Sequence, residues 1–96
     1  MPDDPQLRRT TFIVIDFEGT TPRGHSPEPT EVAAVGLRRT PSGRRRTASF
    51  SALMRLPEHA PLTPAGTAQT GITARMLADR PAAGPVLAAL DARLTF

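Results

Sequence analysis

The sequence predicts an α/β domain in which three strands form an antiparallel meander and helices follow. Residues 12–15, Phe-Ile-Val-Ile, form a continuous apolar run of the kind found in strands buried on both faces. Residues 47–54 place Ala, Phe, Ala and Met on one side and Thr, Ser, Ser and Leu on the other, which is the period of a strand. From about residue 83 onward, apolar side chains recur at helical spacing. Together these patterns predict the order β-β-β-α-α.

A second strand and two connections complete the predicted meander. Residues 31–37 contain two β-branched valines and are expected to form a strand. The preceding residues 19–29 hold two glycines and three prolines, which predicts a loop. Residues 38–46 contain Pro-Ser-Gly between basic flanks and are expected to form a hairpin turn. The short turn favours antiparallel neighbours, with the first strand at one edge.

The helices are predicted from their capping residues. Thr63 followed by Pro64 is typical of a helix start, because threonine caps the free amides and proline suits the first helical position. Gly71 suits the end of that helix. Thr73 can cap a further short turn. A last helix is expected over residues 83–94.

Length and composition predict one small domain. A chain of 96 residues buries roughly 60% of its unfolded surface, so its core is thin. The absence of cysteine excludes disulfides and cysteine metal sites. No apolar run approaches the ~20 residues of a membrane span, and the polar residues 1–9 do not resemble a signal peptide. We expect a disordered tail over residues 1–10, a domain over residues 11–96, and a cytoplasmic protein with no membrane partner.

The basic residues allow a polyanionic partner without demanding one. The formal net charge is +3, the pI is about 11.3, and all twelve basic residues are arginine, a pattern that suggests a high-GC coding bias. Five arginines surround the predicted hairpin turn, either as phosphate contacts or as a solvated turn in an arginine-biased proteome. We favour the solvated turn. No aromatic residues interleave with the arginines, so a stacking platform for bases is unsupported. The five are Arg38, Arg39, Arg44, Arg45 and Arg46.

Asp16 and Glu18 are the most informative residues, because they directly follow the first apolar run. In an extended chain, residues i and i+2 project from the same side, so the two carboxylates repel each other unless a cation neutralises them. Mg²⁺ and Mn²⁺ prefer carboxylate oxygens, and Gly19 allows a ligand to approach the backbone closely. The spacing alone favours two solvated acids at the end of a strand, since Asp-x-Glu is short and common.

The surrounding sequence resembles a known family. Residues 12–20, Phe-Ile-Val-Ile-Asp-Phe-Glu-Gly-Thr, resemble the first motif of the DnaQ-like (DEDD) 3'-5' exonucleases. Residues 31–37 and 50–54 resemble that family's second and third strands, and residues 62–73 resemble its short helix with a Gly-Ile-Thr turn. The resemblance spans residues 11–94. It implies a partial ribonuclease H-like fold, with the later parallel strands missing from this chain.

The resemblance also implies a metal-dependent 3'-5' exonuclease. In that family, Asp16 and Glu18 would hold Mg²⁺ or Mn²⁺ ions, which activate water and steady the scissile phosphate. Gly19 and Thr20 would lie beside the terminal nucleotide, although the family often has threonine where this chain has Gly19. The wall that packs against the terminal base would be lined by Thr70 and Ile72. The implied substrate is the 3' end of single-stranded DNA or RNA, and the implied reaction is hydrolysis of the terminal phosphodiester bond.

The family's later motifs, which resemble His-Asn-x-x-Phe-Asp and His-x-Ala-x-x-Asp, do not occur in this sequence. His25 and His59 are expected to be solvated loop residues rather than the general base. We therefore expect the 96-residue chain alone to be inactive, whether it is a fragment, a truncated product or one piece of a split domain. Two alternatives stay open. One is a non-catalytic remnant that binds nucleic acid or protein, and the other is an unrelated α/β domain. An open edge on the first strand would favour self-association or a partner chain.

Overall fold

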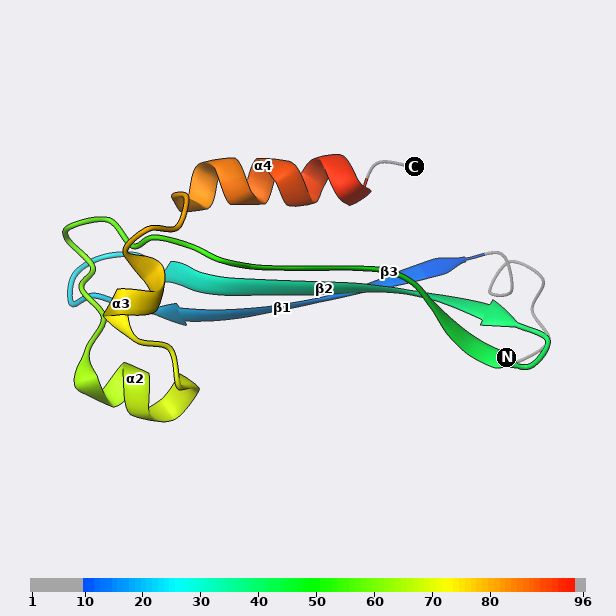
Figure 1. Cartoon of the computed structure of the whole chain (residues 1–96), viewed down its shortest axis with the longest axis horizontal. Coiled ribbons are helices and arrows are strands. Elements are labelled where there is room, and N and C mark those ends of the chain that lie inside the picture. The colour runs from blue at the N-terminus through cyan, green and yellow to red at the C-terminus, as the bar shows by residue number, and fades with distance from the viewer. Residues whose placement is uncertain (1–9, 95–96) are drawn as a thin grey trace.

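The structure, a computed structural model, describes residues 10–94, and Figure 1 shows the arrangement of its elements. Most of the predicted tail, residues 1–9, lies outside the described residues. The strands precede the helices, as predicted, and there are three helices among the described residues rather than two because the short turn that Thr73 caps is itself helical. The strands are β1 (Thr11–Thr20), β2 (Glu28–Thr40) and β3 (Gly43–Leu53), and the helices are α2 (Pro64–Thr70), α3 (Ala74–Leu77) and α4 (Ala83–Leu94).

The three strands form an antiparallel sheet in the order β1-β2-β3, so the predicted meander with the first strand at one edge is confirmed. The strands are longer than the sequence predicts. β1 continues through Thr20, which was expected in a loop, and the turn between β2 and β3 shrinks to Pro41 and Ser42. Apolar periodicity reports burial, whereas backbone pairing also continues through polar residues. The Thr40 hydroxyl closes the turn by donating to the Gly43 carbonyl oxygen at 2.9 Å.

Two bulges interrupt the pairing. The register shifts between Glu18 and Gly19 on β1, where Thr30 is the extra residue of β2, and again between Gly36 and Leu37 on β2. A bulge bends the strand and increases its twist. The regular pairing in the middle of the sheet is therefore bounded at each end by a bulge.

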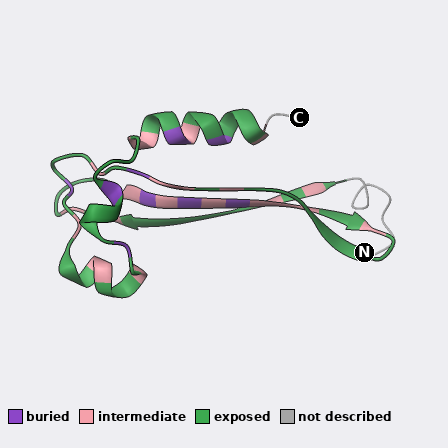
Figure 2. Ribbon diagram, viewed as in Figure 1, coloured by how far each residue is buried: buried purple, intermediate pink, exposed green. Residues whose placement is uncertain are grey.

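The core lies between one face of the sheet and α4. Val32 and Ala34 of β2 pack with Val86 and Leu90 of α4, and Met54 completes the cluster. Figure 2 shows these buried residues along β2 and on the side of α4 that faces the sheet. A hydrogen bond of 2.8 Å from the Arg55 amide to the Pro81 carbonyl oxygen ties the start of α4 to the strand end. The opposite face of the sheet is left open along most of its length.

β1 differs most from the sequence prediction. We expected residues 12–15 to be buried on both faces, and this was wrong. Val14 is 55% exposed, Ile15 is 42% exposed and Phe12 is 48% exposed. The cluster under α4 draws its strand residues from β2 and β3, and among residues 10–94 β1 pairs with β2 alone. An outer strand beyond the helix keeps its apolar side chains in solvent.

The capping predictions are confirmed. The Thr63 hydroxyl accepts a hydrogen bond from the Gly66 amide at 3.0 Å, and Pro64 opens α2. Gly71 ends the helix with φ of 77°, in the left-handed region that favours glycine. The Thr73 hydroxyl accepts from the Met76 amide at 3.2 Å and caps α3. Within residues 10–94, no helix has the length and apolar character needed to cross a membrane.

Candidate active site

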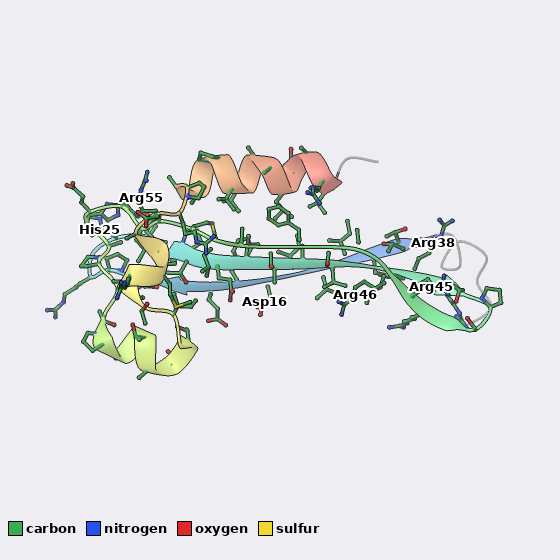
Figure 3. The ribbon with its side chains drawn as sticks, viewed as in Figure 1. Asp16, His25, Arg38, Arg45, Arg46 and Arg55 are labelled. Atoms are coloured by element: carbon green, nitrogen blue, oxygen red, sulfur yellow. The ribbon has the colours of Figure 1, made fainter. Side chains whose placement is uncertain are left out.

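Asp16 and Glu18 lie on β1 and project from the open face of the sheet. Their partners on β2 are Ala33 and Glu31, which alternate with the buried Val32 that faces α4. Residues paired across two strands share a face, so Asp16, Glu18 and Glu31 lie on the side away from α4. Figure 3 shows Asp16 pointing away from that helix. Among the residues that the structure describes, the side chains of Asp16 and Glu18 form no hydrogen bond or ion pair.

Glu31 adds a third carboxylate to this face of the sheet. It stands directly opposite Glu18 in the β1–β2 pairing. Side chains at such positions have Cβ atoms about 4.5–5.5 Å apart, and like charges there destabilise the pair. A bound cation relieves this repulsion. The strand register places Glu31 next to Glu18. The spacing of Asp16 and Glu18 in the sequence carries no information about this neighbour.

These carboxylates fit the oxygen chemistry that Mg²⁺ and Mn²⁺ prefer, but they do not converge into a complete cage. Across residues 10–94, no group of three or more acidic or histidine side chains is close enough to hold one metal ion. Mg²⁺ commonly uses one or two protein carboxylates and keeps several waters. The strands therefore offer hard oxygen ligands without a third ligand close enough to complete a cage among the described residues.

Gly19 sits at the bulge beside Glu18, and its missing side chain has a structural reason. A Cβ atom at Gly19 would lie 2.8 Å from the Glu28 carbonyl oxygen, closer than real Cβ contacts allow. The half-buried Thr20 follows, opposite Glu28. Gly19 therefore lets the β2 backbone approach the end of β1. A shallow open depression adjoins this end, lined by Phe17, Glu18, Gly19, Thr21, Pro27, Glu28 and Pro29.

Replacing Gly19 with alanine is expected to destabilise the domain by about 1–3 kcal/mol, because the β2 backbone must move to admit the new methyl group. The matched control is Gly84→Ala in α4, where nothing lies within 4 Å of the added Cβ atom. That change should stabilise the domain by up to about 1 kcal/mol through helix propensity. Urea denaturation of both variants measures the difference. Equal stability of the two variants would refute the close approach at Gly19.

Thr70 and Ile72 are expected to line the wall for the terminal base. In the structure Thr70 is the last residue of α2, and Ile72 lies in the turn that leads to α3. The Thr70 hydroxyl donates to the Gly66 carbonyl oxygen at 2.9 Å and accepts from the Ile72 amide at 3.1 Å. The Ile72 side chain is only 4% exposed. The structure thus gives both residues a part in the turn, and their contact with a base stays a prediction.

His25 and His59 are both exposed, as expected, but they lie together. Their ring centroids are 4.7 Å apart with an interplanar angle of 35°. His59 Nε2 is 3.4 Å from a carboxylate oxygen of Glu28. Two loops that are distant in the sequence bring these rings together, so no local pattern could have revealed the contact.

Comparisons with known proteins agree with the fold and identify the family. The protein-family model RNase_T, described as Exonuclease, matches residues 13–95. The crystal structure of cell-death related nuclease 4 (CRN-4) superposes with a TM-score of 0.74 at 23% identity, covering 88% of this chain and 29% of that one. A full-length 3'-exonuclease gives a TM-score of 0.71 at 24% identity, covering 83% of this chain and 27% of that one. These two likenesses show the fold.

A third similar structure is Exonuclease X in complex with 5' overhanging duplex DNA, with a TM-score of 0.60 at 27% identity. It covers 81% of this chain and 42% of that one. This chain thus spans less than half the length of each of the three structures. No curated protein matched the sequence. The family match over most of the chain, together with a meander and helices that superpose on the N-terminal portion of exonuclease structures, shows that this chain belongs to the RNase_T exonuclease (DEDD) family.

Proposed function

We propose that this chain contributes the first acidic motif of a divalent-metal-dependent 3'-5' exonuclease acting on the 3' end of single-stranded DNA or RNA. The observation that carries the proposal is the pair Asp16 and Glu18. Both lie within the segment matched to the exonuclease family, on the open face, with side chains that form no hydrogen bond or ion pair among the described residues. Members of this family typically use divalent metals.

In this proposal, the carboxylates of Asp16 and Glu18 would hold Mg²⁺ or Mn²⁺. A metal bound there would supply Lewis-acid chemistry for activating water and neutralising charge on the scissile phosphate. The chain itself provides hard oxygen ligands on a strand that is paired with β2. The Glu31 carboxylate opposite Glu18 adds negative charge that makes cation binding more favourable. The exposed face gives a phosphate access to the site.

The end of β1 supplies the surroundings for a terminal nucleotide. Gly19 and Thr20 lie beside the acidic pair, and the open depression next to them offers space for a sugar or a base. The DNA complex of Exonuclease X supports a nucleic-acid substrate. Thr70 and Ile72 are proposed as contacts of the terminal base.

A Mn²⁺ titration followed by nuclear magnetic resonance tests the metal site. Paramagnetic broadening should first affect the amide signals of residues 16–18 and of Glu31, with an affinity roughly in the millimolar range, because two carboxylates supply too few ligands for tight binding. The control variant Asp16→Asn/Glu18→Gln keeps the shapes of both side chains and should lose the selective broadening. Uniform broadening, or broadening centred on His25 and His59, would refute the site. Submicromolar affinity in calorimetry would show that further ligands complete it.

A further inference from the structure

The far end of the β2–β3 hairpin, residues 38–46, is a paired ribbon rich in arginine, which we call the arginine arm. The strand register places Arg38 opposite Arg45 and Arg39 opposite Arg44, and Arg46 stands opposite Leu37. Like charges directly opposite each other destabilise a strand pair. No aspartate or glutamate occurs within the arm to offset them. A coding bias toward arginine accounts for the choice of arginine over lysine. It does not account for the placement of arginines directly opposite one another on paired strands.

Four of the five arginines of the arm have no partner among the residues that the structure describes. Among residues 10–94, the guanidinium groups of Arg38, Arg44, Arg45 and Arg46 form no hydrogen bond or ion pair. All four side chains are exposed. The core under α4 lies nearer the middle of the sheet, and the arm extends to one end of a molecule that is 49 Å long. The arm therefore presents its positive charge to solvent.

Part of the arm shares a face with the acidic pair. Residues 33, 35, 37 and 39 of β2 alternate onto the open face, so Arg39 and its partner Arg44 lie on the same side as Asp16, as does Arg46. Figure 3 shows Asp16 and Arg46 both pointing away from α4 and Arg38 pointing toward its side. At ~3.3 Å per residue, Arg46 lies ~13 Å and Arg39 ~20 Å along the sheet from Asp16.

We propose that the arginine arm binds backbone phosphates of the substrate strand upstream of the 3' end held at Asp16 and Glu18. This inference rests on the proposed function. One strand of a stacked B-form helix advances ~3.4 Å along its axis per phosphate, and an extended single strand advances further, so the arm reaches phosphates within about six nucleotides of the terminus. The planar guanidinium group of arginine can donate two parallel hydrogen bonds to one phosphate. Since no aromatic side chain interrupts the arm, the contacts position the strand and are independent of base sequence.

Fluorescence anisotropy with labelled single-stranded DNA tests this arm. The 96-residue chain is titrated in EDTA against oligonucleotides of about 3 and about 12 nucleotides, of which the shorter carries too few phosphates to contact the whole arm. The variant Arg39→Gln/Arg44→Gln/Arg46→Gln should weaken binding of the longer DNA at least about tenfold and reduce the salt slope by about 2. The variant Arg39→Lys/Arg44→Lys/Arg46→Lys keeps the charge and should retain the salt slope of DNA binding. The shorter DNA should respond little.

The matched control is Arg23→Gln/Arg75→Gln/Arg80→Gln, which removes the same charge from exposed positions outside the arm. Equal weakening by the two triple variants would overturn the proposal, because only net charge would then matter. Failure of the unchanged chain to bind the longer DNA would also overturn it. The Asp16→Asn/Glu18→Gln variant separates this proposal from the proposed function. The loss caused by the arm substitutions should persist in that background even if the acidic pair proves unable to bind a metal.

Discussion

At rising concentration, the 96-residue chain is expected to self-associate through β1. Among residues 10–94, the outer edge of β1 is unpaired, and its apolar side chains are about half exposed, with Val14 at 55% and Phe17 at 50%. No lysine or proline guards this strand, whereas β3, at the other edge, carries three arginines and several hydroxyl side chains. Exposed apolar edges are templates for further strand pairing. The expected association is therefore between β1 strands.

Antiparallel pairing of two β1 strands centred on Ile15 avoids opposed acids, since Asp16 then faces Val14 and Glu18 faces Phe12 of the other copy. The variant Ile15→Lys places two like charges directly opposite each other at this centre. It should raise the concentration needed for association at least about tenfold. The control Ser49→Lys adds the same charge on β3, at an exposed position.

Sedimentation velocity across a concentration series measures the effect. The unchanged chain and Ser49→Lys should both gain mass with concentration, while Ile15→Lys should stay monomeric over the same range. If the unchanged chain sediments as a monomer at every concentration, then another part of the molecule covers the β1 edge. Equal association of all three proteins would show that another surface is responsible.

No release of nucleotides from single-stranded DNA or RNA is expected from the 96-residue chain incubated alone with Mg²⁺ or Mn²⁺. The described residues contain no group of three or more acidic or histidine side chains that can hold one metal. Catalytic groups that act as a unit fail together, and losing one commonly costs about 10⁴-fold or more in rate. His25 and His59 contact each other, and His59 lies beside Glu28 rather than Asp16 or Glu18. They are therefore poorly placed to serve as a general base.

The measurement is chromatographic detection of mononucleotides after prolonged incubation, with the Asp16→Asn/Glu18→Gln variant run in parallel. Any release that persists in the variant comes from a contaminating nuclease. Metal-dependent release that disappears in the variant would contradict the prediction. It would then require replacement ligands, with Glu31 as the first candidate because it lies opposite Glu18.

Features that depend on near neighbours were determined by the sequence alone. Thr63 and Thr73 were recognised as caps because their hydroxyls bond amides three residues away. The carboxylates of Asp16 and Glu18 share a face because alternate residues of any extended chain do so. The order of strands and helices follows from apolar periodicity, which is also local. Each of these expectations depends on contacts within one turn or one strand.

The tertiary structure decided which strand faces solvent and which charges meet. The apolar run of β1 predicts burial, because apolar side chains prefer to leave water. The sequence does not show how many other elements pack against that strand, and this number decides whether the side chains are buried. In the structure α4 packs over β2 and β3, and the side chains of β1 stay exposed. The pairings of Glu18 with Glu31 and of Arg38 with Arg45 depend on strand register. Register is set jointly by turn length, by buried faces and by bulges, which join residues far apart in the chain.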